Sequence, residues 1–296
     1  MRGRSAGPVL GAALLLSASR VLAAEGAVDI EPINGPPKET RPVNGYWSAG
    51  EARWFLSTKS DLGTFYAKPY FSAGYGMPHW LWAGVDVNAI STLEFGQVYG
   101  GLRAASPLVD LAFGVRDTFA YQKHFLLPAA SYRDEDVLAG PAAKARYWAW
   151  EAEAVGILPL PYSAILVDYI AVRTLDVPAG QSVYDESYRV IVANPFFQVL
   201  RVAAVARFLR ESALKVGVLG EFIASTGRDK PVFRAGPAAA LQITDHLEAL
   251  CTLSLSISGP DKLGIVMGAY GLAGVRYRWA TGEPTPKFPW QGAVIP

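Results

Sequence analysis

The chain has 296 residues, enough for one large all-β domain or two small ones. Its 27 Lys and Arg nearly balance its 26 Asp and Glu, so the charge gives no support for nucleic-acid binding, which needs a concentrated basic face. Cys251 is the only cysteine, which excludes an intrachain disulfide.

Residues 1–23 predict a signal peptide. Arg2 and Arg4 form a basic start, Val9–Leu16 is a short apolar segment too short to span a bilayer as a helix, and small residues precede the expected cleavage after residue 23. Residues 24–50 are rich in Pro and Gly and indicate an extended arm without a core of its own, which we expect to lie in the periplasm.

The remaining chain lacks the runs of about 20 apolar residues that a helical membrane protein needs, although 51% of all residues are hydrophobic. The longest apolar stretch, Ala154–Val167, contains Pro159 and Pro161. An exported chain this apolar must either bury its apolar surface in a core or expose it to lipid through strands.

Alternation of apolar and polar side chains, interrupted by turn residues, predicts strands along residues 51–280. The clearest case is 246–257, where Leu253, Leu255 and Ile257 share one face and Ser254 and Ser256 share the other. We predict twelve strands, at about residues 53–59, 64–74, 80–90, 93–104, 108–121, 143–155, 162–173, 187–210, 213–225, 232–243, 246–257 and 263–279.

The strand count depends on how Asn194-Pro195 is interpreted. A turn there would give thirteen strands, whereas single-chain bacterial barrels usually have an even number. We expect 187–210 to be one strand that rises above the membrane, because the long connections 122–142 and 174–186 then both lie outside and both chain ends lie in the periplasm. Ten or fourteen strands remain open alternatives.

Alternation alone does not tell which face of a strand is inside, because a soluble barrel turns its apolar face inward. Strands of this length can cross a bilayer when tilted, and aromatic residues gather near predicted strand ends, as in interfacial girdles. We therefore predict an all-β chain that forms a closed antiparallel up-and-down transmembrane β-barrel. The expected girdle residues are Tyr75, Trp80 and Trp82 near one rim and Phe119, Tyr121, Tyr147, Trp148 and Trp150 near the other.

The last strand carries Gly274, Tyr277 and Trp279 at the spacing G-x-x-aromatic-x-aromatic. This pattern resembles the closing-strand signal of bacterial outer-membrane β-barrel proteins. The resemblance implies that these residues are a barrel-assembly signal and that the chain lies in the outer membrane of a Gram-negative bacterium. It also implies contact with the barrel-assembly machinery, outer-membrane lipid and lipopolysaccharide.

A Pro-rich tail, 281–296, follows the closing strand, and we expect it in the periplasm. Extended Pro-rich segments lose little entropy on binding. The arm and the tail therefore offer contacts to periplasmic or outer-membrane protein partners, or they are flexible linkers.

If the apolar side chains face lipid, the alternate set lines the lumen. An isolated buried charge costs several kcal/mol, so the charges there must be paired or hydrated. Twelve strands lie between filled eight-stranded barrels and open porins, so size does not decide between a filled lumen and a water-filled passage. The predicted lumen-lining charges are Lys68, Asp86, Arg103, Asp110, Arg116, Glu151, Glu153, Asp168, Arg201, Arg207, Lys215, Glu221, Arg234, Glu248, Arg276 and Arg278.

We expect no catalytic residues, no cofactor and no metal site. His79, His124 and His246 lack metal-ligand spacing, and the sequence contains neither a G-x-S-x-G elbow nor a phosphate-binding Gly-rich loop. Three functions remain. The first is a structural or anchoring component of an envelope-spanning complex, of the motility or polysaccharide-export type. The second is a passive, porin-like channel for small solutes, and the third is a barrel-embedded lipid hydrolase.

Overall fold

The computed structural model describes residues 52–63, 65–78, 81–138, 144–160, 163–193, 195–207, 214–244 and 246–281. The predicted signal peptide, the arm 24–50 and all of the tail except Thr281 lie outside these residues. Within them, no helix is both long and apolar enough to cross a membrane.

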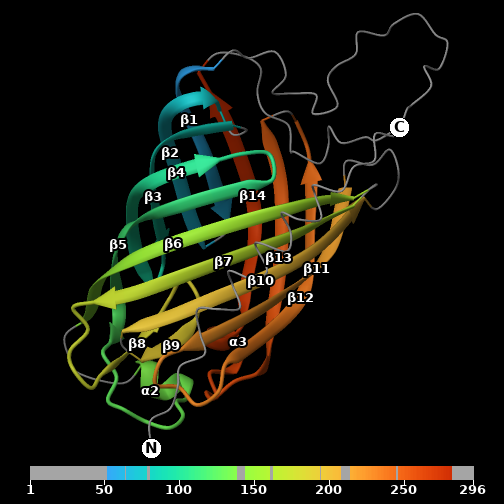
Figure 1. Cartoon of the computed structure of the whole chain (residues 1–296). Helices are drawn as coiled ribbons and strands as arrows, with labels where there is room; N and C mark the ends of the chain where they lie inside the picture. The colour runs from blue at the N-terminus through green and yellow to red at the C-terminus, as the bar shows by residue number, and fades with distance from the viewer. Residues whose placement is uncertain are drawn as a thin grey trace, which may run out of the picture. The chain divides into compact units, whose positions relative to one another are not determined.

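Twelve strands close into one antiparallel barrel, which confirms the predicted fold class (Figure 1). Each wall strand pairs with its neighbours, and the first pairs with the last. The wall strands are β1 (Arg53–Gly63), β2 (Tyr66–Met77), β3 (Leu81–Thr92), β4 (Phe95–Ala105), β5 (Val109–His124), β6 (Lys144–Leu160), β7 (Ser163–Leu175), β10 (Phe196–Arg207), β11 (Leu214–Ser225), β12 (Val232–Gln242), β13 (Leu247–Ser258) and β14 (Tyr270–Ala280).

The apolar side chains of the wall point outward. In β13, Leu253, Leu255 and Ile257 are exposed, whereas Glu248 and Ser254 are fully buried inside. This is the reverse of a soluble barrel, in which the apolar face would be buried. The exposed apolar wall therefore suits hydrocarbon rather than water as its surroundings.

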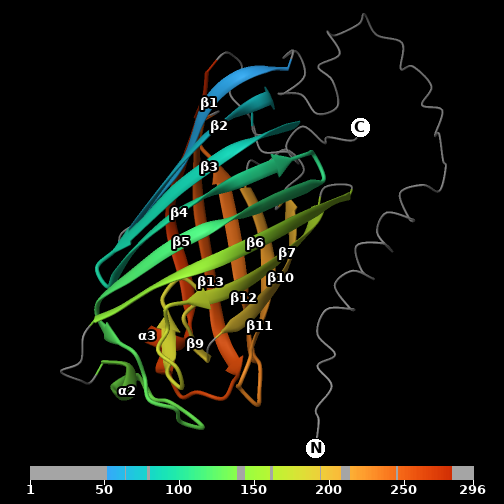
Figure 2. The same ribbon diagram turned by 60° about the vertical axis from the view of Figure 1, so that its left-hand side comes forward.

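The two rims of the barrel differ. β1 begins and β14 ends at one rim, and the connections 106–108 and 243–246 at this rim are short. The opposite rim carries the long connections 125–143, 176–195 and 259–269, which include the short helices (Figure 2). Bacterial barrels have short periplasmic turns and longer external loops, so we name the first the periplasmic rim and the second the outer rim.

The predicted strand 187–210 is wrong in its first part. The wall strand β10 begins directly after a turn at Pro195, because proline has no amide hydrogen to donate to the ladder. The preceding chain forms a separate hairpin of β8 (Ser182–Asp185) and β9 (Val190–Ala193). Residues 190–192 are all buried, so neither face of β9 is exposed. The count of twelve wall strands holds because this hairpin is not part of the wall.

The predicted strand 263–279 is also wrong at its start. The helix α3 (Gly264–Gly268) precedes β14, and a second short helix, α2 (Asp134–Leu138), lies in the connection between β5 and β6. Gly264 has a φ of 60°, a left-handed conformation that glycine adopts readily and that ends the extended path. Leu263 and Met267 are buried among the loops instead of alternating along a strand.

Two of the expected girdle residues face inward. Trp82 is buried and packs edge-on against Phe55, with ring centroids 5.3 Å apart, and Tyr147 is buried in the lumen. Trp148 and Trp150 do point outward, with more than two fifths of their surface exposed. The sequence indicates that these aromatic residues lie near strand ends. It does not determine whether each side chain points into the lumen or outward, because a shift of one residue in the pairing register reverses the two faces. Trp80 lies outside the described residues.

The barrel closes where β14 meets β1. Gly274 lies opposite Gly63, and a Cβ atom on Gly274 would lie 2.2 Å from the carbonyl oxygen of Leu62. Tyr277 and Trp279 are exposed on the outer face of β14. In this pattern the glycine permits a close approach of the two strands, and the aromatic rings face the surroundings of the wall.

Gly274→Ala should destabilise the closed barrel by about 1–3 kcal/mol, because the added methyl group overlaps the Leu62 carbonyl and the strands must shift. Gly271→Ala on the same strand is the matched control, since a Cβ there lies 3.7 Å from Leu253, an ordinary contact. The measurement is the fraction of fast-migrating barrel on unboiled gels across a urea series. Equal unfolding midpoints for the two variants would contradict a steric need for glycine at this position.

Candidate functional site

The structure places the predicted lumen charges inside the barrel, where most of them form ion pairs. At least fourteen of the sixteen have an oppositely charged partner within 4.0 Å. Lys68 lies with its ammonium 4.8 Å from the ring centroid of Tyr70, and Arg207 is half-buried on β10. The pairs are Arg103 with Asp86, Asp110 and Glu153, Arg116 with Glu151, Arg201 with Asp168 and Glu221, Arg234 with Glu221, Lys215 and Arg278 with Glu248, and Arg276 with Asp61.

Arg103 shows how one guanidinium ties several strands together. Its Nε donates to Asp86 of β3 at 2.9 Å and its Nη1 to Asp110 of β5 at 2.8 Å, while its Nη2 lies 3.4 Å from Glu153 of β6. The planar group carries five N–H donors, so it can serve three carboxylates at once. Asp110 and Glu153 are 34% and 28% exposed, so water reaches this part of the lumen.

The sequence prediction misses Asp61, because it ends the first strand at residue 59. Asp61 is buried and accepts two hydrogen bonds from Arg276, from Nε at 2.6 Å and from Nη2 at 2.8 Å. Continuing the alternation of 53–59 by two residues would have placed Asp61 on the lumen face. This ion pair joins β1 to β14, the two strands that close the barrel. It therefore adds charged hydrogen bonds to the backbone hydrogen bonds between them.

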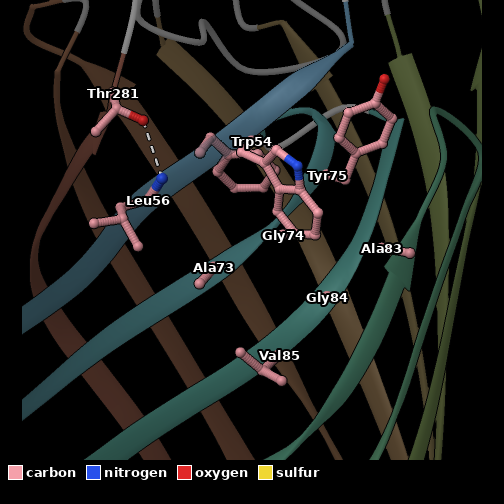
Figure 3. A pocket seen from close by; sticks show the side chains of 10 residues that line it. Trp54, Leu56, Ala73, Gly74, Tyr75, Ala83, Gly84, Val85 and Thr281 are labelled. Atoms are coloured by element: carbon pink, nitrogen blue, oxygen red, sulfur yellow. Dashed lines mark hydrogen bonds between the residues drawn. The ribbon is translucent and has the colours of Figure 1, made fainter.

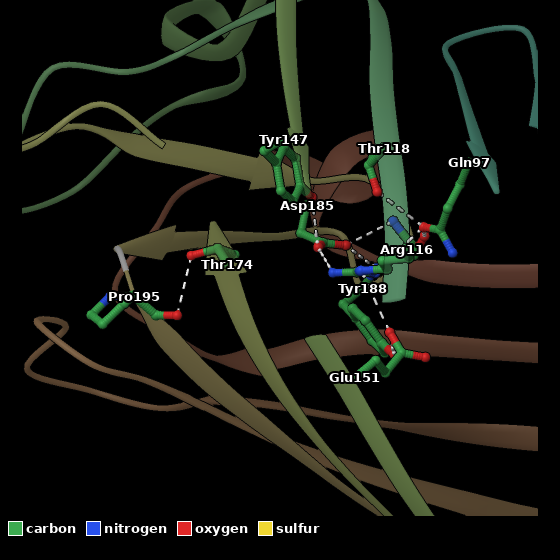
Figure 4. Close-up of polar contacts among 10 residues, drawn as sticks. Gln97, Arg116, Thr118, Tyr147, Glu151, Thr174, Asp185, Tyr188 and Pro195 are labelled. Carbon is green, nitrogen blue, oxygen red and sulfur yellow. Dashed lines mark hydrogen bonds and ion pairs between the residues drawn. The ribbon is translucent and has the colours of Figure 1, made fainter. Parts of the chain in front are cut away.

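The β8–β9 hairpin lies inside the barrel near the outer rim (Figure 1), and side chains at its turn contact the wall strands (Figure 4). Asp185, at the end of β8, is fully buried and pairs with Arg116 of β5, which is also fully buried. The hydroxyl of Tyr147 on β6 donates to the same carboxylate at 2.8 Å. Two wall strands therefore hold the hairpin through one carboxylate, and we name the β8–β9 hairpin with its turn, residues 182–193, the plug.

The turn of the plug is held by side chains from opposite sides of the wall. The Ser187 hydroxyl donates to Gln97 of β4 at 2.6 Å. On the other side, Arg234 of β12 donates to the carbonyl oxygens of Tyr188 at 2.8 Å and of Arg189 at 2.5 Å. Contacts to β4, β5, β6 and β12 show that the plug spans the lumen rather than lying against one strand.

Apolar side chains fill the space between the plug and the wall. Val183, Val190 and Val192 of the plug are buried against inward-facing residues of β5, β6, β7, β10, β11 and β12. Tyr188 packs edge-on against Phe197, with ring centroids 5.4 Å apart. The side of the outer lumen formed by β5 to β7 and β10 to β12 is thus packed as a protein core. The wall members of this core are Ala120, Ala145, Tyr147, Ala149, Ile170, Val172, Phe197, Val199, Ile223 and Val232.

The loops of the outer rim form a compact cap next to the plug. The backbone N–H of Tyr132 donates to Asp261 at 3.0 Å, and Arg228 also pairs with Asp261. Burial raises the pKa of Asp261, although the Tyr132 N–H and Arg228 favour its ionised form. The hydroxyl of Tyr184 on β8 donates to the Met267 carbonyl at 2.8 Å, which joins the cap to the plug. The small apolar core of the cap consists of Leu126, Tyr132, Val137, Tyr184, Ile191, Leu263 and Met267.

Sequence reasoning missed the plug and its residues Asp185, Glu186 and Tyr188. The available signal was the segment 182–193, where polar residues in the middle separate two short apolar runs, as in a hairpin. That signal lies inside the predicted connection 174–186 and the predicted strand 187–210, so the assumption of one long strand concealed it.

The outer surface of the wall has an apolar hollow of about 660 Å³ on β1–β3 (Figure 3). Trp54 and Tyr75 form one side of it, with ring centroids 5.5 Å apart, and Ala73 and Ala83 lie between the larger side chains. The hollow has no charged lining residue, so it offers a surface for acyl chains but no reactive group.

Within the described residues no group of three or more His, Cys, Asp or Glu is arranged to hold a metal ion. His246 lies on the β14 side of the wall, with Nδ1 3.0 Å from the Arg278 carbonyl oxygen, and His124 lies opposite Lys144 on the wall. His79 lies outside the described residues.

No protein-family model matches the chain, and no curated protein matches it either. Among solved structures, one is the outer-membrane protein OmpT of Vibrio cholerae, folded in vitro, at 11% identity and a TM-score of 0.35, with 77% of this chain and 97% of that chain covered. Another, described as "Unveiling the Mechanism Behind the in-meso Crystallization of Membrane Proteins", has 9% identity and a TM-score of 0.41, with 82% of this chain and 90% of that chain covered.

The architecture itself defines the class of the chain. The wall is closed and antiparallel with an apolar outer face and enclosed charges. The long loops lie at one rim, and the start of β1 and the end of β14 lie at the other. Together these features give the chain the fold of bacterial outer-membrane β-barrels.

The stability of the barrel should depend on pH through Glu186 in the turn of the plug. Burial raises the pKa of Glu186 from 4.5 to about 7, although Lys123 lies 2.6 Å away and favours the ionised form. The unfolded chain releases this proton at lower pH than the folded chain, so the free energy of unfolding should fall by roughly 3 kcal/mol between about pH 4.5 and 7 and level off above.

Urea unfolding midpoints measured across this range test the prediction. Glu186→Gln should remove this part of the pH dependence, and Glu135→Gln, a change of an exposed loop carboxylate, should leave it in place. A Glu186→Gln variant with the full pH dependence of the parent chain would show that another group titrates.

Proposed function

We propose that the chain is a closed, non-conducting outer-membrane barrel that anchors an envelope-spanning assembly, of the motility or polysaccharide-export type. The observation that supports this most is the plug, a hairpin of the chain itself that occupies the lumen near the outer rim. A barrel that fills its own lumen with packed side chains has no continuous path for solutes at that level.

The packing of the plug argues against easy opening. Four aliphatic side chains of the hairpin, Val183, Val190, Ile191 and Val192, are almost completely buried. Their burial stabilises the closed arrangement by up to about 6–12 kcal/mol. The buried pair of Asp185 with Arg116 adds to this, because withdrawing the hairpin would leave the arginine buried without its carboxylate.

The anchoring half of the proposal is supported by the rim at which β1 begins and β14 ends. Thr281, just beyond β14, holds the start of β1: its hydroxyl accepts a hydrogen bond from the Leu56 N–H at 3.0 Å, and its carbonyl accepts one from Arg53 at 3.2 Å. The sequence continues from this same rim in both directions, with the Pro-rich segments 24–50 and 281–296. Two extensions at one rim suit attachment to periplasmic partners.

A porin-like channel is the second candidate, and one observation favours it. The charges away from the plug, such as Asp110 and Glu153, are partly exposed, so a wet space exists in the lumen. It becomes a passage only if the plug leaves. No observation among the described residues favours the barrel-embedded lipid hydrolase.

The full chain should give no steady ion conductance in a planar bilayer, because the plug closes the lumen. Replacing residues 182–193 by a short Gly-Ser linker should produce steady current steps, since it removes the packed hairpin but leaves the twelve wall strands. Single-channel recording measures both.

The matched control replaces the exposed residues 229–231, which also lie in an outer-rim loop but outside the wall and the plug. This control should give no steady current steps. Gel migration before and after boiling shows whether each variant is a closed barrel, and Asp185→Ala with Tyr188→Ala serves if the linker variant does not fold. Steady conductance of the unaltered chain would rule out the closed barrel.

Removing residues 282–296 should reduce the set of proteins that cross-link to the chain in the envelope, because this Pro-rich segment continues the chain from Thr281 at the periplasmic rim. Pull-down after cross-linking measures this. The control replaces the tail with a Gly-Ser segment of equal length, which keeps the length but not the sequence and should lose the same partners. An unchanged partner set in both variants would argue against a contact through the tail.

A further inference from the structure

Charged side chains on the outward face of the wall are confined to one place. Among the described wall strands, the outward positions are apolar, small or uncharged except near the outer-rim ends of β5, β6 and β7. Asp117, Lys144, Arg146 and Arg173 lie there, and His124 lies opposite Lys144. A cation on the lipid face of a barrel destabilises it most at the bilayer centre and less near the interface, so a cluster of cations there needs a physical reason.

Arg146 is held in a defined direction. Its Nε donates to Asp117 of the neighbouring strand at 3.2 Å and its Nη2 to the other carboxylate oxygen at 2.5 Å, and yet its side chain is 65% exposed. The carboxylate orients the guanidinium, and the remaining donors stay available at the surface. Lys144 and Arg173 are exposed, and neither has a carboxylate within 4.0 Å among the residues that the structure describes. The cluster therefore carries excess positive charge.

Aromatic rings lie among these cations. Arg173 pairs directly with Trp150 of β6 on one side and with Phe196 of β10 on the other, and Arg146 pairs with Phe119 of β5. Trp150 is exposed and stacks on Phe113 deeper on the wall, with centroids 5.5 Å apart. Amphipathic rings in membrane proteins gather at the headgroup level. The interleaving thus places the cations at the headgroups of the outer leaflet rather than in the hydrocarbon.

We propose that Lys144, Arg146 and Arg173, the basic wall patch, bind the phosphorylated headgroup of an outer-leaflet lipid, whose acyl chains lie along the neighbouring wall. Guanidinium groups recognise phosphate through paired N–H donors. Arg173 lies opposite Trp150, four residues along β6 from Arg146, so the two positions are roughly 13 Å apart along the wall. That separation favours a headgroup that carries two phosphates over one that carries a single phosphate.

Native mass spectrometry of the full chain in detergent, with added lipid, tests this. Diphosphoryl lipid A should be retained more strongly than monophosphoryl lipid A, and phosphatidylcholine should not be retained. Arg173→Gln should weaken retention of the diphosphoryl lipid about tenfold, the loss of one charged hydrogen-bonding contact. Arg173 has no described ion-pair partner that the change would leave uncompensated.

The double variant Asp117→Asn with Arg146→Gln removes the charge of Arg146 together with that of its partner. No carboxylate is then left unpaired on the lipid face. It should weaken binding of the diphosphoryl lipid and abolish its advantage over the monophosphoryl lipid. Arg133→Gln with Lys230→Gln changes two exposed loop cations and should alter retention by less than about twofold.

Three results would overturn the proposal. Equal loss in the loop control would show non-specific attraction of anions. Unchanged retention in both patch variants would show that the lipid binds elsewhere. A lipid-free dimer that disappears in the Arg173→Gln variant would make the patch an interface between copies of the chain. Gel migration before and after boiling confirms that each variant tested is a closed barrel.

Discussion

The structure depends on one electrostatic constraint: charges enclosed by a closed wall must find partners inside it. Arg116 has no exposure to water, and among the described wall residues the carboxylate within 4.0 Å of it is Glu151, at 3.5 Å. Asp185 of the plug supplies the close partner, and Tyr147 completes the site with a hydrogen bond to the same carboxylate. The plug thus supplies the carboxylate that a buried arginine of the wall needs, and the wall supplies the positive charge that the buried carboxylate of the plug needs.

The lumen has two parts, which differ in how their inward side chains are stabilised. Next to the plug, the inward side chains are mainly apolar and packed, as in a soluble core. Away from the plug, ion pairs such as those of Arg103 with its three carboxylates join neighbouring strands. Asp110 and Glu153 are partly exposed, so water also solvates these charges. The packed part supports a closed barrel, and the hydrated part is the region that a solute could enter if the plug were withdrawn.

The outer face of the wall has the opposite distribution of apolar and charged side chains. Its solvent is lipid, so apolar side chains are exposed and charges are excluded, except at the outer-rim ends of β5 to β7. There Arg146 keeps its charge at the surface through Asp117, and aromatic rings lie beside it. The two faces of one strand can therefore carry a charge for different reasons, as Arg116 and Asp117 show at adjacent positions on β5. The inner charge needs a protein partner, and the outer pair meets the headgroups.

The sequence by itself determined the wall. Period-two alternation is a local property, so it located all twelve wall strands to within a few residues at most ends and indicated which face of β13 is apolar. It did not separate the plug from the wall, because residues 190–192 are apolar on both faces and carry no alternation that would tell a wall strand from a buried hairpin. Only the closed barrel, which brings Arg116, Gln97 and Arg234 around the segment 182–193, decides that this segment turns inward. The choice between wall and lumen depends on partners far apart in the chain, and no local pattern encodes their meeting.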